Sequence, residues 1–137
     1  MKMDATAFVA DQELVVELKK HATRIDCAQD CVLFRQGGAP EGLYIFCGGQ
    51  VWLTLKSSAG DEVMSLSVEA GSLLGLPAVI GNVPYSLSAR ARKGSLVSFI
   101  QREDFSRLML THPSISVGVL RVLAAEVRTA RAALVEI

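Results

Sequence analysis

The sequence predicts an α+β domain: an antiparallel β-roll, a jelly-roll-like double-stranded β-helix, with one N-terminal helix and two C-terminal helices. Between about residues 31 and 100, short apolar runs show the two-residue period of strands. Glycines separate these runs at intervals of about ten residues, as in sandwiches and barrels. The final third has helical spacing instead. Because strands and helices do not alternate, a parallel α/β sheet is not expected.

The length and composition limit the possible classes of protein. A chain of 137 residues, 50% of them apolar, forms one domain with a real core. We expect a single domain over residues 1–137, with the β-roll at about 24–101 and the C-terminal helices at about 102–135. The formal charge of zero indicates no general attraction to nucleic acid or anionic membranes. With no apolar run near a membrane span and no signal peptide, we expect a cytoplasmic protein without a membrane partner.

The three cysteines are an odd count, which argues against a disulfide framework. Cys27, Cys31 and Cys47 together with His21 form a conceivable iron–sulfur or zinc set, but the spacing is not a standard one. We favour small, partly buried thiols, and we expect no metal and no cofactor.

The first helix is predicted over residues 11–22, with Asp11 as the N-cap. A strand follows at 32–38. Residues 43–47 and 51–56 predict two strands that form a hairpin around Gly48, Gly49 and Gln50. Three further strands are predicted at 63–68, 85–91 and 95–100, with 63–68 next to 51–56.

The C-terminal region predicts a helix over residues 102–110 and a long helix from Pro113 to Ile137. The long helix carries a seam with alternating spacings of three and four: Leu120, Leu123, Val127, Ala130, Leu134 and Ile137. Its length, about 35 Å or more at about 1.5 Å per residue, exceeds what so small a domain can cover. We therefore expect a homodimer through this helix, and the alternative is that the seam packs on the chain's own β-roll.

Three stretches carry a family resemblance: LFRQGGAPEGLYIFCGGQVWL at 33–53, AGSLLG at 70–75 and SLSARA at 86–91. With Gly60 and the order of the elements, they resemble the cyclic nucleotide-binding domain. The match is closer to the sensor half of the catabolite-activator/FNR-type bacterial regulators, over roughly residues 12–135. The resemblance implies that residues 75–86, here called the cassette, correspond to the family's phosphate-binding segment.

The cassette departs from the family pattern at its charged positions. In the family, a Glu after the cassette glycine holds the ribose, and an Arg beside a Ser or Thr neutralises the phosphate. After Gly75, this chain has Leu76 and Pro77 at and beyond the Glu position, and it has Tyr85 at the Arg position, with Ser86 keeping the hydroxyl. These five are the candidate ligand-binding residues.

Loss of both charged groups predicts very weak binding of cyclic AMP or cyclic GMP, because an unpaired phosphate in a pocket is costly. The nearest cations, Arg90 and Arg92, are expected to face solvent. Arg131 is the further candidate for a substitute.

The function predicted is a non-catalytic regulatory or sensor domain with a divergent pocket that takes a small apolar or aromatic effector, or none. One alternative is a dimerisation or partner module with a vestigial pocket. A cupin-type metalloenzyme is disfavoured, since it needs a cluster of His and Glu, and His21 and His112 lie outside the predicted strands. The family's helix-turn-helix would follow the long helix, so we expect no specific DNA binding by this chain alone.

Overall fold

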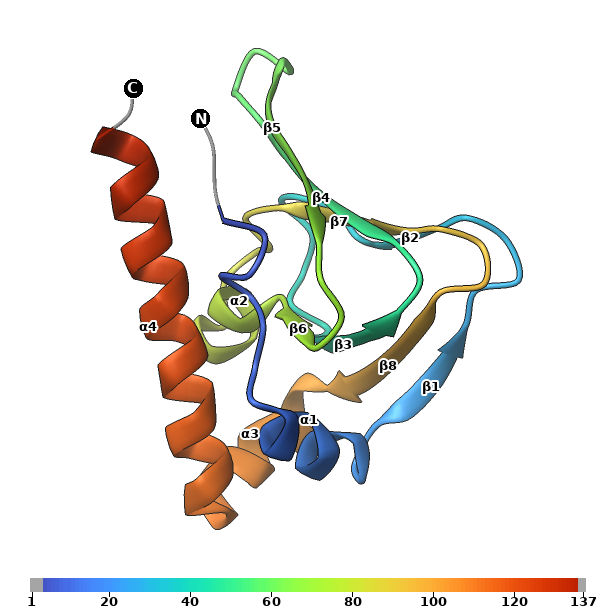
Figure 1. Ribbon diagram of the computed structural model, residues 1–137, viewed down its shortest axis with the longest axis vertical. Coiled ribbons are helices and arrows are strands. Elements are labelled where there is room, and N and C mark those ends of the chain that lie inside the picture. The colour runs from blue at the N-terminus through green and yellow to red at the C-terminus, as the bar shows by residue number, and fades with distance from the viewer. Residues whose placement is uncertain (1–3, 136–137) are drawn as a thin grey trace.

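The computed structural model describes residues 4–135. Figure 1 shows a β-roll flanked on one side by helices, and within the described residues the order of elements confirms the predicted fold class. The elements are α1 (Gln12–Lys19), β1 (Thr23–Asp26), β2 (Cys31–Phe34), β3 (Gly42–Gly48), β4 (Val51–Lys56), β5 (Glu62–Val68), β6 (Ser72–Leu74), α2 (Leu76–Gly81), β7 (Ser88–Ala91), β8 (Leu96–Gln101), α3 (Arg102–Thr111) and α4 (Pro113–Val135).

The strands form two antiparallel four-stranded sheets. One has the order β1-β8-β3-β6 and the other the order β2-β7-β4-β5. The chain passes repeatedly from one sheet to the other, as in a jelly roll, which confirms the predicted antiparallel β-roll.

The predicted hairpin between residues 43–47 and 51–56 is wrong. β3 pairs with β6 and β8, whereas β4 pairs with β5 and β7, so the chain changes sheets between β3 and β4. Gly49 makes this crossing with a φ of 98°. The Ser95 hydroxyl then satisfies both backbone groups of Gln50, since it accepts from the N–H and donates to the C=O at 3.1 Å. The predicted pairing of 51–56 with 63–68 is confirmed as β4 with β5.

Other boundaries also differ from the sequence predictions. β7 begins only at Ser88, so residues 85–87 of the predicted strand do not belong to it. Asp11 lies at the N-cap of α1, but its side chain makes no capping hydrogen bond. β1 and β6, of four and three residues, were not predicted as separate strands.

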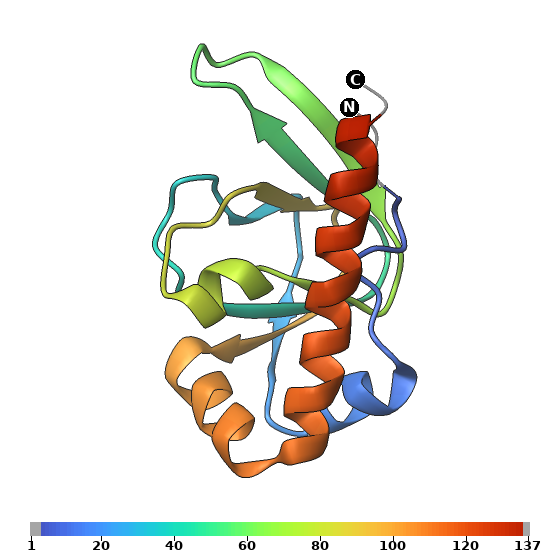
Figure 2. The same cartoon turned by 90° about the vertical axis from the view of Figure 1, so that its left-hand side faces the viewer.

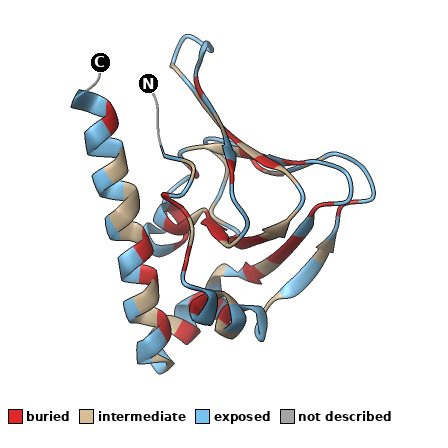
Figure 3. Ribbon diagram, in the orientation of Figure 1, coloured by how far each residue is buried: buried red, intermediate tan, exposed pale blue. Residues whose placement is uncertain are grey.

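Two hydrophobic cores lie on opposite faces of the sheet that contains β3. Tyr44 and Phe46 point into the roll, whereas Leu43 and Ile45 point towards the helices. This alternation is the ordinary period of a strand, here buried on both faces (Figure 3). β3 therefore joins the roll interior to the layer formed by α1, α3 and the first half of α4.

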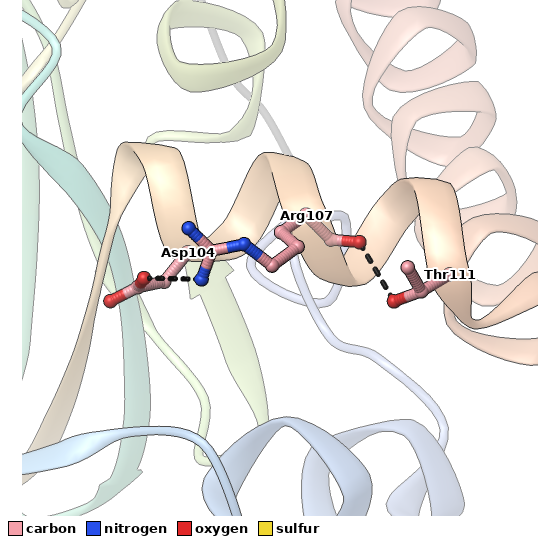
Figure 4. Close-up of polar contacts among 3 residues, drawn as sticks. All are labelled: Asp104, Arg107 and Thr111. Carbon is pink, nitrogen blue, oxygen red and sulfur yellow. Dashed lines mark hydrogen bonds and ion pairs between the residues drawn. The ribbon is translucent and has the colours of Figure 1, made fainter.

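The helical layer is held by polar contacts within α3 and by the close approach of α4 to α1. On α3, Arg107 bonds the carboxylate of Asp104 at 3.1 Å, and the Thr111 hydroxyl donates to the Arg107 carbonyl at 2.8 Å (Figure 4). Gly118 lets α4 approach α1 closely, since a Cβ there would lie 2.9 Å from Cδ2 of Leu14. The glycine that interrupts the long predicted helix is thus a packing requirement.

Within residues 4–135, no single helix has both the length and the apolar character needed to cross a bilayer. Only α3 and α4 taken together, with a bend of 113° between them, satisfy those criteria.

A substitution at Gly42 tests how closely β3 is packed against its neighbours. A Cβ at Gly42 would overlap the Ile100 carbonyl oxygen and the ring of Phe99. We expect Gly42→Ala to lower the free energy of unfolding in urea by about 3 kcal/mol or more. Gly48→Ala on the same strand is the matched control: its Cβ would make an ordinary 3.4 Å contact with Leu96, so a change below about 1 kcal/mol is expected. Equal losses in the two variants would contradict this account.

Candidate functional site

The cassette begins where β6 ends. Gly75 has a φ of 95°, a conformation that favours glycine, and a Cβ there would lie 2.8 Å from the Tyr85 ring. α2 follows with Pro77 in its first turn, as predicted for residues 76–80, and it ends at Asn82 in the left-handed region with a φ of 51°. The cassette thus has the predicted backbone shape.

Tyr85 fixes the other end of the cassette to the β-roll. Its hydroxyl donates to the Gly42 carbonyl at 2.6 Å and accepts from the Gly42 N–H at 3.1 Å. Its ring stacks on Phe34 with centroids 4.1 Å apart and planes at 19°. Burial raises the pKa of Tyr85, so the hydroxyl stays neutral. Tyr85 is therefore an uncharged structural anchor.

A small cavity, here called the roll cavity, lies between the cassette and α4 and has a volume of about 30 Å³. Four of the five candidate ligand residues line it: Gly75, Pro77, Tyr85 and Ser86. The fifth, Leu76, does not: it is fully buried in the other core, facing the helices. A larger open groove between α1 and α4 contains none of the five.

Glu126 also lines the roll cavity, and the sequence analysis did not identify it. It belongs to an inward stripe on α4 whose buried members are Ile115, Val119, Val122 and Ala133. The Oε2 atom of Glu126 is buried and has no hydrogen-bond partner among residues 4–135. Burial raises the pKa of this carboxyl to about 8. The signal that reveals it is the second stripe of threes and fours along α4, in which Glu126 is the acidic member.

The three arginines considered as substitutes lie away from the roll cavity. Arg90 is exposed between buried Ala89 and Ala91 on β7, which places it on the outer face of its sheet. Arg92 is exposed and approaches the side chain of Gln50 at 3.4 Å, and Arg131 is exposed on α4. Among the described residues that line the cavity, Glu126 is the acidic one, and none is basic.

The predicted seam forms an outward stripe on α4. Leu120, Val127 and Leu134 are 60%, 46% and 63% exposed, Ala130 is also exposed, and Leu123 is half-buried. Ile137 lies outside the described residues. The structure thus separates this stripe from the inward one: the inward stripe packs on the rest of the chain, and of the described seam residues only Leu123 also contacts that core.

The cysteines do not assemble with His21. Cys27 Sγ lies 3.3 Å from Cys31 Sγ, and burial raises the pKa of Cys27 to about 11. Cys47 is on β3, where its thiol lies 3.8 Å from the Ile45 carbonyl oxygen. His21 instead packs edge-on against His112, with ring centroids 5.7 Å apart. Across residues 4–135, no three His, Cys, Asp or Glu side chains gather in a way that suits a metal ion.

Comparisons with known proteins place the chain in a family. The model of the cyclic nucleotide-binding domain matches residues 24–112, so the chain belongs to that family. The family is a regulatory domain and is generally non-catalytic. A comparison with curated protein sequences found no match.

Solved structures share the fold. The catabolite activator protein of Thermus thermophilus is 24% identical with a TM-score of 0.78, covering 96% of this chain and 62% of that one. The N-terminal domain of a transcriptional regulator from Streptomyces coelicolor A3(2) is 22% identical with a TM-score of 0.66, covering 93% and 91%. The regulator CLP of Xanthomonas campestris, described as responsive to c-di-GMP, is 20% identical with a TM-score of 0.66, covering 88% and 63%.

The fold is therefore that of the sensor domain of catabolite-activator-type regulators, as the sequence resemblance implied. The chain spans about three fifths of the Thermus protein's length.

Glu126 predicts a pH dependence of stability. Its pKa rises from an ordinary 4.5 to about 8 on folding, so the folded state holds the proton more tightly. Stability from this group is complete below about pH 4.5 and is lost as the pH rises towards 8. Relative to Glu126→Gln, the wild type should lose about 1.4 kcal/mol of unfolding free energy per pH unit in that window. Urea denaturation of both proteins from pH 5 to pH 9 measures this, and parallel curves would contradict it.

Proposed function

We propose that this chain is the sensor domain of a bacterial transcription regulator, and that its pocket no longer accepts a cyclic nucleotide. The observation that carries the proposal is the lining of the roll cavity: its acidic member is Glu126, and none of the described lining residues is a cation that could neutralise a phosphate. The effector is then a small apolar or aromatic molecule, because the cavity walls are mainly hydrophobic and aromatic.

Three features of the cassette support this proposal. Leu76 points away from the cavity, so no side chain at that position holds a ribose. The Tyr85 hydroxyl is already bonded to both backbone groups of Gly42. The arginines Arg90, Arg92 and Arg131 are exposed elsewhere. A phosphate in the cavity would therefore be desolvated without a compensating charge, which costs several kcal/mol.

The alternative is a dimerisation or partner module with a vestigial pocket. The small volume of the cavity, about 30 Å³, favours that alternative, since it has room for little more than a water molecule or two. The unpartnered carboxyl of Glu126 favours the sensor, because a merely vestigial pocket gains nothing from a buried carboxyl. A cupin-type metalloenzyme fits neither the family match nor the placement of the histidines.

We also propose that the outward stripe forms a parallel homodimer. Its leucines and valine are exposed on a long helix, and the inward stripe accounts for the packing of α4 on the domain. An apolar seam with this spacing is buried when a second helix packs on it. Because the formal charge is zero, we expect the chain alone not to bind duplex DNA specifically.

Cyclic nucleotides test the pocket directly. We expect cyclic AMP, cyclic GMP and c-di-GMP to bind no tighter than about 1 mM by calorimetry, which corresponds to roughly −4 kcal/mol. A dissociation constant in the low micromolar range for any of them would contradict the proposed pocket chemistry. A thermal-shift screen of small aromatic compounds is the companion measurement. A ligand at a hundred times its dissociation constant stabilises by about 2.7 kcal/mol, whereas a vestigial pocket responds to none.

The outward stripe is tested by charge insertion. Val127→Glu should convert the dimer to a monomer in light scattering at micromolar concentration, because it places a carboxylate in the centre of the apolar contact. Ala132→Glu is the matched control: Ala132 is exposed and five residues further along α4, about 140° around the helix. A wild-type monomer, or equal effects of the two substitutions, would contradict the proposed interface.

A further inference from the structure

Glu126 is the most unusual polar group among the described residues. Its Oε2 atom is buried and unpartnered, and it lies in a cavity whose other lining residues are uncharged. A buried carboxyl without a partner is destabilising, so an apolar residue at this position would make the domain more stable. This cost is explained if the carboxyl meets a ligand.

The walls around the carboxyl restrict the charge of such a ligand. Phe8, Phe34 and Tyr85 line the same cavity, and the last two are stacked on each other. Aromatic faces attract cations and not anions. A carboxylate and aromatic rings together therefore suit a positively charged group, whereas an anion would be repelled by both.

The present volume of about 30 Å³ limits the size of a ligand unless a wall moves. Tyr85 is held by Gly42, so the cassette wall is anchored. The opposite wall, α4, packs on α1 and α3, and Ile115, Val119 and Val122 are buried in its first half. Among the described residues beyond Glu126, Ala133 alone is buried. Figure 2 shows α4 lying along the roll as one continuous helix. Because fewer buried side chains hold its second half, this half is the wall that an outward shift would move.

We propose that the roll cavity binds a small organic cation, an amine or amidine with an apolar body, and that the Glu126 carboxylate is its counter-ion. This inference rests on the proposed sensor function and specifies the chemical class of its effector. Binding converts an unpaired buried carboxyl into one with a charge-assisted hydrogen bond, which is among the stronger polar contacts in proteins. The same event pushes on the second half of α4, which carries Val127, Ala130 and Leu134 of the outward stripe.

Two isosteric series test the charge preference at two sizes: acetamidine, acetamide and acetate, and benzamidine, benzamide and benzoate. Calorimetry or ligand-observed NMR gives the ratio of affinities within each series. In the wild type, at least one amidine should bind about tenfold tighter than its amide, with the carboxylate weakest. Glu126→Gln should bring the ratio of amidine to amide close to one and leave amide binding unchanged. Glu126→Asp, which keeps the charge, should retain a preference for the amidine.

Proton release is an independent measurement. Without a ligand, burial raises the pKa of the Glu126 carboxyl to about 8. Binding of an amidine at pH 7 should therefore release about one proton. Calorimetry in two buffers of different ionisation enthalpy measures this release. The amidine affinity of the wild type should rise about tenfold from pH 7 to pH 9. Glu126→Gln should show neither effect, whereas a carboxyl with a purely structural role would leave both absent in the wild type too.

The outcomes separate this inference from the proposed function. If an amide binds as tightly as its amidine, or if Glu126→Gln keeps the preference, the proposed cationic ligand is ruled out. The proposal of an apolar sensor pocket is then unaffected. If no compound in either series binds, the proposed cationic ligand is also ruled out. If a cyclic nucleotide binds with micromolar affinity, the proposed function and this inference fall together.

Discussion

The cassette keeps its place because the buried Tyr85 hydroxyl bonds both backbone groups of Gly42. This pair joins the end of the cassette to the first residue of β3, the strand that contributes to both cores. It also directs the Tyr85 ring onto Phe34, and these two rings form one wall of the roll cavity. This anchor is uncharged and holds the cassette by hydrogen bonds within the chain alone. The acidic group of the cavity comes instead from α4.

Much of the fold could be predicted from the sequence, because strand alternation and helix spacing are local properties. Strand pairing could not be predicted in the same way. Alternation along β3 and β4 indicates which side chains face inward, but it does not say whether consecutive strands share a sheet. The crossing at Gly49 depends on Ser95, a residue 46 positions further along the chain. β6 is buried throughout, so no alternation marked it.

The candidate site was predicted in part for a related reason. The family resemblance, and not spacing, supplied Gly75, Pro77, Tyr85 and Ser86, which line one cavity. A residue at the start of a short helix can face either core, and Leu76 faces the helices. Glu126 was missed because a lone Glu in a seam-bearing helix is usually a solvated one. Its burial follows from the way α4 packs along the roll, which is a tertiary property.

The two stripes of α4 limit where the chain can gain or lose residues. One face of the helix meets the domain's own core and cavity, and the other is exposed. Inserting or deleting one residue between Val122 and Val127 would rotate the second half of α4 against the first by about 100°, which would break both stripes. Insertions are therefore incompatible with the middle of α4. By contrast, the turn at residues 57–61 lies at the tip of the β4–β5 hairpin, which projects away from the rest of the roll (Figure 1). A change of length there would leave both cores and both stripes of α4 in place.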